Sequence, residues 1–216
     1  MNDFSFLRGK FITFEGVEGA GKSTQSKILV EFLNKNGANA VWTREPGGCP
    51  EAEEIRNFVV TGSVNKMDGI AELLLMCAAR RLHTEKKIKP LLASGATVVS
   101  DRYFDSSLAY QGFGHGISQE KIDSLRKITL DGFAPDLTLV LDLDVEEGLR
   151  RTSKRKETAS RFENMDIEFH RRVRDGFNYV CETDGERCLK IDASKSSVEE
   201  LQKIIWEDIL GFFGRK

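Results

Sequence analysis

Eight residues near the start of the chain combine glycines, a lysine and a hydroxyl group at a spacing suited to binding phosphate. Glycines allow backbone N–H groups to converge on phosphate oxygens, and the N-terminus of a following helix adds positive potential. A lysine at the seventh position reaches the β- and γ-phosphates, and the hydroxyl after it ligates Mg²⁺. The residues are Gly16, Val17, Glu18, Gly19, Ala20, Gly21, Lys22 and Ser23, which fit GxxxxGK[ST] and are followed by Thr24.

This phosphate-binding loop is specific for a nucleoside triphosphate but not for one activity. Its four fixed positions coincide by accident in roughly 1% of chains of this length or fewer, given average glycine usage. Switches, motors and kinases all carry it. Residues 65–68, Asn-Lys-Met-Asp, also match the NKxD pattern of small GTPases. Because no DxxG lies between Ser23 and Asn65, we interpret these four residues as a surface turn and the start of a helix.

Two arginines and an aspartate indicate a second anion site. Arg44 and Arg102 each come shortly after a predicted strand or at its end, and Asp101 directly precedes Arg102. An arginine there can clamp a second phosphate, and an aspartate at the end of a buried strand can hold magnesium or a metal-bound water. The alternative is that the arginines form ordinary salt bridges at helix starts. Together with the loop, they predict a cleft for two phosphate groups.

Alternating strand and helix patterns would place these residues at one edge of a sheet. Strands separated by helices predict a parallel sheet covered on both faces, and such sheets bind ligands beyond the carboxyl ends of their strands. The expected fold is α/β, a doubly wound five-stranded parallel sheet. The expected strands are 11–15, 40–44, 97–100, 137–142 and 188–191, the expected helices include 51–59, 68–93, 196–210 and three starting at Ser118, Val145 and Met165, and 111–116 and 150–161 are expected to be loops.

Composition limits the class of protein. The 216 residues, 40% of them hydrophobic, predict one domain over 1–216, and a net charge of -2 offers no basic field for nucleic acid. The four cysteines show no zinc-site spacing and fit a reducing cytoplasm. The most apolar stretch, 70–79, contains Glu72 and is too short to cross a bilayer. We expect a cytoplasmic protein with no nucleic-acid or membrane partner.

Four motifs together resemble the thymidylate kinase family along nearly the whole chain. They are FEGVEGAGKST (14–24), TREPGG (43–48), AARR (78–81) and SDRYFDSSLAYQGFG (100–114), in the family's order and approximate spacing. The resemblance implies a P-loop NTPase fold of the nucleoside monophosphate kinase type, with Mg²⁺ as cofactor. It also implies transfer of the γ-phosphoryl group of ATP to dTMP, and pairing into a homodimer, for which the helix 68–93 offers an apolar face.

The resemblance assigns roles in dTMP binding position by position. Glu18 is expected near the sugar 3′-hydroxyl, and Arg44 and Arg102 on the dTMP phosphate. Asp101 and Ser23 are expected to serve the metal. The remaining positions face the nucleoside: Arg80 donates to thymine O4, Ser107 and Gln111 make polar contacts to the base, and Tyr110 crowds out a ribose 2′-hydroxyl.

Met76 departs from the family pattern. It lies one helical turn before Arg80, on the same face, where the family is expected to place a base-stacking phenylalanine. A methionine can cover a base through its polarizable sulfur, although less rigidly than an aromatic ring. Two readings stay open, because Met76 can equally be a core side chain.

A basic cluster follows the strand that ends at Asp142, and its position is similar to that of the kinase lid, at about 150–163. Its members are Arg150, Arg151, Lys154, Arg155, Lys156 and Arg161. A lid excludes water, so that the phosphoryl group reaches dTMP instead of solvent. Some family members carry an arginine inside the phosphate loop, whereas this loop has Gly19 at that position. We therefore expect a catalytic arginine from the lid, with Arg155 as first choice and Arg151, also near ATP, as second.

Two alternatives remain. The first is another small-molecule or nucleoside monophosphate kinase with the same loop and lid, from which the segment TREPGG and residues 101–111 distinguish this chain. The second is a regulatory nucleotide-binding module without catalysis. The paired arginines of the second phosphate site and the basic lid disfavour it.

Overall fold

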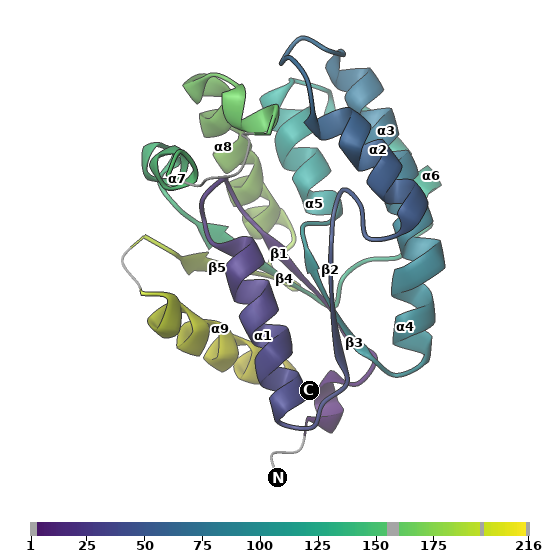
Figure 1. Ribbon diagram of the computed structural model, residues 1–216, viewed down its shortest axis with the longest axis vertical. Coiled ribbons are helices and arrows are strands. Elements are labelled where there is room, and N and C mark those ends of the chain that lie inside the picture. Colours follow the sequence, from purple (N-terminus) through teal and green to yellow (C-terminus); the bar gives the residue numbers. More distant parts are fainter. Residues whose placement is uncertain (1–3, 155–159, 195–196, 215–216) are drawn as a thin grey trace.

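The computed structural model describes residues 4–154, 160–194 and 197–214, and its centre is a five-stranded parallel sheet (Figure 1). The strand order is β2-β3-β1-β4-β5, so the chain moves to one side of β1 and then crosses to the other. The doubly wound α/β fold expected from the sequence is confirmed. The strands are β1 (Phe11–Glu15), β2 (Ala40–Arg44), β3 (Thr97–Asp101), β4 (Leu137–Asp142) and β5 (Cys188–Asp192).

The carboxyl ends of three neighbouring strands are level with one another. In the register of the sheet, Phe14 pairs with Asp101, and Asp101 pairs with Arg44. The residues that follow β1, β2 and β3 therefore emerge side by side. Such an edge, at the point where the strand order reverses, is where doubly wound sheets bind their ligands.

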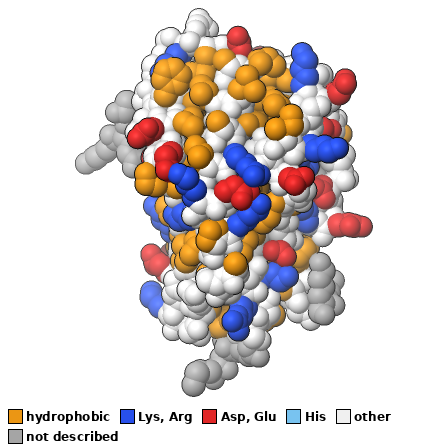
Figure 2. Space-filling view, turned by 90° about the vertical axis from the view of Figure 1, so that its right-hand side faces the viewer, with side chains coloured by type: hydrophobic (Ala, Val, Ile, Leu, Met, Phe, Trp, Pro, Cys, Tyr) orange, Lys and Arg blue, Asp and Glu red, His pale blue; other side chains and the backbone are white. Residues whose placement is uncertain are grey.

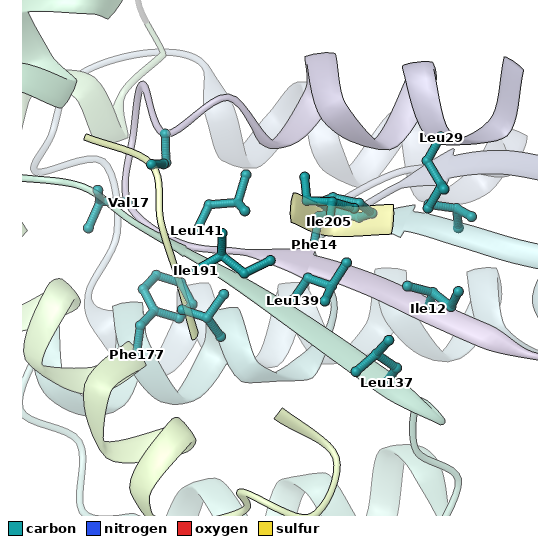
Figure 3. Close-up of a cluster of buried hydrophobic side chains, with 14 of the residues drawn as sticks. Ile12, Phe14, Val17, Leu29, Leu137, Leu139, Leu141, Phe177, Ile191 and Ile205 are labelled. Atoms are coloured by element: carbon teal, nitrogen blue, oxygen red, sulfur yellow. The ribbon is translucent and has the colours of Figure 1, made fainter. Parts of the chain in front are cut away.

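Helices cover both faces of the sheet, as Figure 1 shows. Helices α1 and α9 pack on one face, whereas α4 and α8 contact the other, with α2 lying against α3. Figure 3 shows Phe14 and Leu29 between the sheet and α1, and Phe177 of α8 on the opposite side. The helices are α1 (Lys22–Lys35), α2 (Pro50–Val60), α3 (Gly69–His83), α4 (Lys89–Ala93), α5 (Phe104–Ser107), α6 (Gln119–Leu130), α7 (Val145–Thr152), α8 (Ile167–Thr183) and α9 (Val198–Phe213).

Short helical turns join several of these helices. The π-helical turn η2 (Thr84–Ile88) links α3 to α4, so the long helix expected over 68–93 is present with a change of pitch. Asp68 caps its start by accepting a hydrogen bond from the Ala71 N–H. The NKxD match is therefore a turn and a helix start, as interpreted. The turns η1 (Ser5–Leu7) and η4 (Phe162–Asn164) are 3₁₀-helical.

One predicted loop is wrong. The glycines of 111–116 predict a loop, but most of these residues belong to the π-helical turn η3 (Leu108–Gly114), which continues α5. Gly114 is needed for close packing and not for a turn, because a Cβ on Gly114 would lie 2.6 Å from the Phe169 ring of α8. Likewise, the predicted loop over 150–161 starts later than expected, since α7 continues to Thr152.

Among the described residues, no helix combines the length and the hydropathy that crossing a bilayer requires.

Candidate active site

The phosphate-binding loop connects β1 to α1, in the strand-loop-helix context that the motif requires. Gly16, Gly19 and Gly21 have φ angles of 132°, 74° and 93°, which L-residues rarely adopt. Space excludes a side chain as well, because a Cβ on Gly16 would overlap the Leu141 carbonyl of β4. The loop is thus held against the neighbouring strand, with its N–H groups at the start of α1.

Helix α7 rests directly on the phosphate-binding loop. A Cβ on Gly19 would overlap the carbonyl oxygen of Gly148 in α7, and a Cβ on Gly148 would overlap the carbonyl oxygen of Glu18. The two backbones therefore approach each other closely only because both residues are glycines. This glycine contact places α7, which leads into the predicted lid, beside the loop.

Lys22 is the buried cation of the loop. Its Nζ donates to the Val17 carbonyl at 2.6 Å and lies 3.9 Å from the Glu18 carboxylate. Burial lowers the pKa of Lys22 to about 8, and the nearby charge of Arg102 acts in the same direction. An ammonium removed from solvent is stabilised by an anionic partner. The phosphate oxygens of a nucleotide bound in this loop would be such a partner.

Ser23 and Asp101 meet as the metal-site prediction requires. The Ser23 hydroxyl donates to Asp101 Oδ2 across 78 residues of sequence, at the junction of α1 and β3. A hydroxyl and a carboxylate beside the phosphate-binding lysine are the hard oxygen ligands that Mg²⁺ prefers, and Mg²⁺ usually takes only one or two protein groups besides phosphate and water. The donor set fits that ion.

Arg102 faces the loop with an unusual backbone conformation. Its φ is 73°, its Nη2 pairs with Glu18 at 2.5 Å, and the same nitrogen donates to the Tyr110 hydroxyl at 2.9 Å. Burial opposes charge on Glu18, but the charges of Arg102 and then Lys22 lower the pKa of that carboxyl. The predicted acceptor-phosphate arginine and the predicted sugar-contacting glutamate are therefore ion-paired in this structure.

Glu15 supports this strained turn, a role for which the local sequence carries no signal. Its fully buried carboxylate accepts from the Tyr103 N–H at 2.7 Å and from the Ser106 hydroxyl at 2.6 Å. Burial raises the pKa of Glu15 to about 7, with the charge of Asp105 as the second cause. This carboxylate ties the segment that carries Arg102 to the end of β1.

Arg80 is fixed by hydrogen bonds on three sides. It donates to Glu45 at 2.6 Å, to the Ser107 hydroxyl at 2.8 Å and to the Tyr103 carbonyl at 3.0 Å. The guanidinium carries five N–H donors, so some remain for a ligand. Glu45 in turn lies 3.0 Å from His83 Nδ1, which makes that histidine structural.

Arg44 is the more accessible of the two predicted phosphate arginines. Its side chain is 42% exposed and pairs with Glu53 of α2 at 3.1 Å. Arg56, which no motif flagged, stands next to it: Arg56 donates to the Pro46 carbonyl at 2.7 Å, and the charge of Arg44 contributes to lowering its pKa after burial itself. Nothing in the sequence indicates that Arg56 belongs to the site, because a single arginine on a helix cannot be distinguished from an ordinary solvent-exposed arginine.

One cavity of about 850 Å³ brings most predicted site residues together. It runs from the phosphate loop to the start of η3, and side chains of α2, α3 and the lid segment also border it. The predicted residues that line it are Glu18, Gly19, Gly21, Lys22, Ser23, Thr24, Arg44, Met76, Arg80, Asp101, Arg102, Ser107, Tyr110 and Gln111. Met76 is also 8% exposed and packed in the hydrophobic core, so both readings of it remain compatible with the geometry.

The arginines of the lid segment fall into different environments. Arg150 and Arg151 both pair with Glu147 of α7, and Arg151 is not among the described residues that line the cavity. Arg161, grouped with the lid cations by sequence, is 1% exposed and donates to the Val59 carbonyl. Arg161 therefore attaches the C-terminal end of the predicted lid segment to α2. Arg155 lies outside the described residues.

The chain is similar to known proteins over nearly its whole length. The thymidylate kinase family model matches residues 14–205. A thymidylate kinase of Bradyrhizobium sp. (strain ORS 278) is 44% identical over 204 residues, covering 94% of this chain and 90% of that protein. The thymidylate kinase of Magnetococcus marinus is 44% identical over 207 residues, covering 96% and 98%. The crystal structure of thymidylate kinase from Ehrlichia chaffeensis has a TM-score of 0.76 at 35% identity, covering 94% of this chain and 98% of that one.

Proposed function

The chain belongs to the thymidylate kinase family, and on that premise we propose that it transfers the γ-phosphoryl group of ATP to dTMP, giving dTDP and ADP for dTTP synthesis. The main support for this proposal is that the phosphate loop and the acceptor-side arginines, Arg44 and Arg102, line the same cavity. Donor and acceptor phosphates would meet between them. Phosphoryl transfer needs little beyond such positioning and electrostatic stabilisation.

On the donor side, the loop from Gly16 to Thr24 binds the ATP phosphates through its backbone N–H groups, and Lys22 holds the β- and γ-oxygens. Ser23 and Asp101 would hold Mg²⁺, which would supply positive charge to the transferring oxygens. We expect excess EDTA to stop ADP release and added MgCl₂ to restore it. Asp101→Asn should raise the MgCl₂ concentration needed for half-maximal rate, whereas an unchanged requirement would remove Asp101 from the metal site.

On the acceptor side, we propose the roles that the resemblance implies, supported by the position of these residues around one cavity. Arg102 and Arg44 bind the dTMP phosphate, and Glu18, which is paired with Arg102, accepts from the sugar 3′-hydroxyl. Tyr110 fills the space of a ribose 2′-hydroxyl, since its ring is buried and its hydroxyl is bonded to Arg102. The base lies along Met76, with Arg80, Ser107 and Gln111 toward its polar edge.

A substrate panel tests the assignment directly. ADP release is measured with Mg²⁺ and ATP in the presence of dTMP, dUMP, UMP, dCMP, AMP or shikimate. We expect the highest kcat/KM with dTMP. A higher value with any other member would favour the alternative, a P-loop kinase for a different nucleoside monophosphate or small molecule.

We further propose that two copies pair through the exposed apolar face of α2, α3 and α6. Figure 2, turned so that this side faces the viewer, shows hydrophobic side chains gathered on its upper part. Phe58, Ile70, Leu74 and Ile128 lie on these helices, with exposed fractions of 53%, 40%, 50% and 76%. Contiguous apolar surface of this kind marks protein interfaces.

Sedimentation tests the pairing. Wild type is expected to sediment as a dimer, and Leu74→Glu to shift it toward monomer, because a buried carboxylate without a partner is costly. Val198→Glu is the matched control, since Val198 is 47% exposed on α9 at the other face of the sheet. A dimeric Leu74→Glu would place the interface elsewhere.

The four cysteines are free thiols, which supports our proposal of a cytoplasmic location.

A further inference from the structure

Glu72 of α3 is a fully buried carboxylate that the proposed reaction does not use. It is held by three residues from two other parts of the chain, Gln111 and His115 of η3 and its C-cap and Arg161 at the start of η4. Its Oε1 accepts from Gln111 Nε2 at 2.7 Å and lies 3.3 Å from His115 Nε2, and its Oε2 accepts from Arg161. A charge buried to this degree persists only where partners compensate it.

The charge on Glu72 decides how the Gln111 amide is oriented. Burial opposes ionisation, but the nearby His115 ring and the hydrogen bonds from Arg161 and Gln111 lower the pKa of Glu72. An ionised carboxylate only accepts hydrogen bonds, so the amide nitrogen of Gln111 must face it. The amide oxygen is then directed elsewhere. Gln111 Oε1 is buried and has no hydrogen-bond partner among the described residues, although Gln111 lines the cavity.

We propose that Glu72 is a specificity-determining positioning residue, which fixes Gln111 so that the cavity offers a hydrogen-bond acceptor to the edge of the base. The inference rests on the proposed function. It identifies the base class that the cavity accepts, namely a pyrimidine with hydrogen on N3, and the class that it rejects, a pyrimidine with a lone pair there.

The pattern of donors and acceptors separates thymine from cytosine. Thymine carries a donor at N3 and an acceptor at O4, which suit the Gln111 oxygen and the Arg80 guanidinium. Cytosine has the reverse pattern, with a lone pair at N3 and an amino donor at position 4. A glutamine free to rotate would satisfy either base at N3. The fixed carboxylate removes that freedom.

The substitution Glu72→Gln tests the inference, because an amide at position 72 can donate as well as accept and so permits either orientation of Gln111. We expect the ratio of kcat/KM for dTMP over dCMP to fall about tenfold, mainly through a lower KM for dCMP, with kcat for dTMP little changed. Arg161→Lys is the matched control: it keeps the cation beside Glu72 and should leave the ratio unchanged.

Two outcomes would overturn the inference: a folded Glu72→Gln enzyme with the wild-type ratio, or an equal fall in Arg161→Lys. Failure of the proposed function is distinguishable, because wild type would then not favour dTMP at all. If Glu72→Gln does not fold, ¹⁵N NMR of the wild type decides. The Gln111 side-chain amide, identified by its loss in Gln111→Leu, should show one downfield, slowly exchanging proton with and without dTMP. An unshifted, rapidly exchanging amide would contradict the fixed orientation.

Discussion

Replacing Lys22 by alanine is expected to abolish measurable turnover, with kcat falling at least about 10³-fold. The side chain is buried beneath the phosphate loop and is already oriented by the Val17 carbonyl and Glu18. We therefore expect its charge to stabilise the transferring phosphoryl group without prior rearrangement of the side chain. ADP release in a coupled assay measures the loss.

Protein stability separates this effect from misfolding. The pKa of Lys22 is about 8 in the folded chain, below the ordinary 10.5, because of burial. The unfolded chain thus binds more protons between pH 8 and 10.5, so the ammonium destabilises the fold fully below pH 8 and progressively less as pH rises. Lys22→Ala should keep or raise Tm at pH 7. Lys27→Ala, at another lysine that lines the cavity, is the control and should retain most activity. Substantial turnover by Lys22→Ala would remove the lysine from the mechanism.

The second large effect is expected for Arg155→Ala, with kcat lowered roughly 10³- to 10⁵-fold and little change in KM for ATP or dTMP. That range corresponds to about 4–7 kcal/mol of transition-state stabilisation. Two observations support the choice. Thr152 and Ser160, which bracket Arg155 in sequence, both line the cavity, and the described lid arginines on either side are engaged elsewhere.

Arg151→Ala is the matched control for the lid. Arg151 pairs with Glu147 at 2.8 Å on α7, so its removal should change kcat far less than removal of Arg155. Single-turnover measurement with bound ATP separates transfer from product release. An Arg155→Ala enzyme with normal kcat would transfer the role to Arg151 or to another cation.

Local sequence signals predicted the scaffold well but not the contacts that join distant segments. The strands could be found from apolar runs, because a strand buried on both faces, such as 97–101, leaves a local pattern. The pairing of Ser23 with Asp101 followed from the rule that strand ends share one edge. By contrast, Glu15 and Arg161 read as an ordinary strand end and a lid cation, since the burial that gives them their roles arises from residues 88 and 102 positions away.

The structure around Gln111 was also not predictable from the local sequence pattern. The resemblance assigns Gln111 to the base, but its glycine-rich surroundings indicate a loop. The contact of η3 with α8, in which Gly114 admits the Phe169 ring, overrides that local preference. Gln111 donates a hydrogen bond to Glu72, a residue of α3 that lies 39 positions earlier, and a contact over that distance leaves no mark in the local sequence pattern.

The close approach of Gly19 and Gly148 limits which substitutions the phosphate-binding loop can accept. An arginine at position 19 would place its Cβ where this chain has the backbone of α7. A single mutation at Gly19 would therefore create a clash before the new arginine could contribute to catalysis. The effect of a substitution at position 19 therefore depends on residue 148 and on how closely α7 packs against the loop.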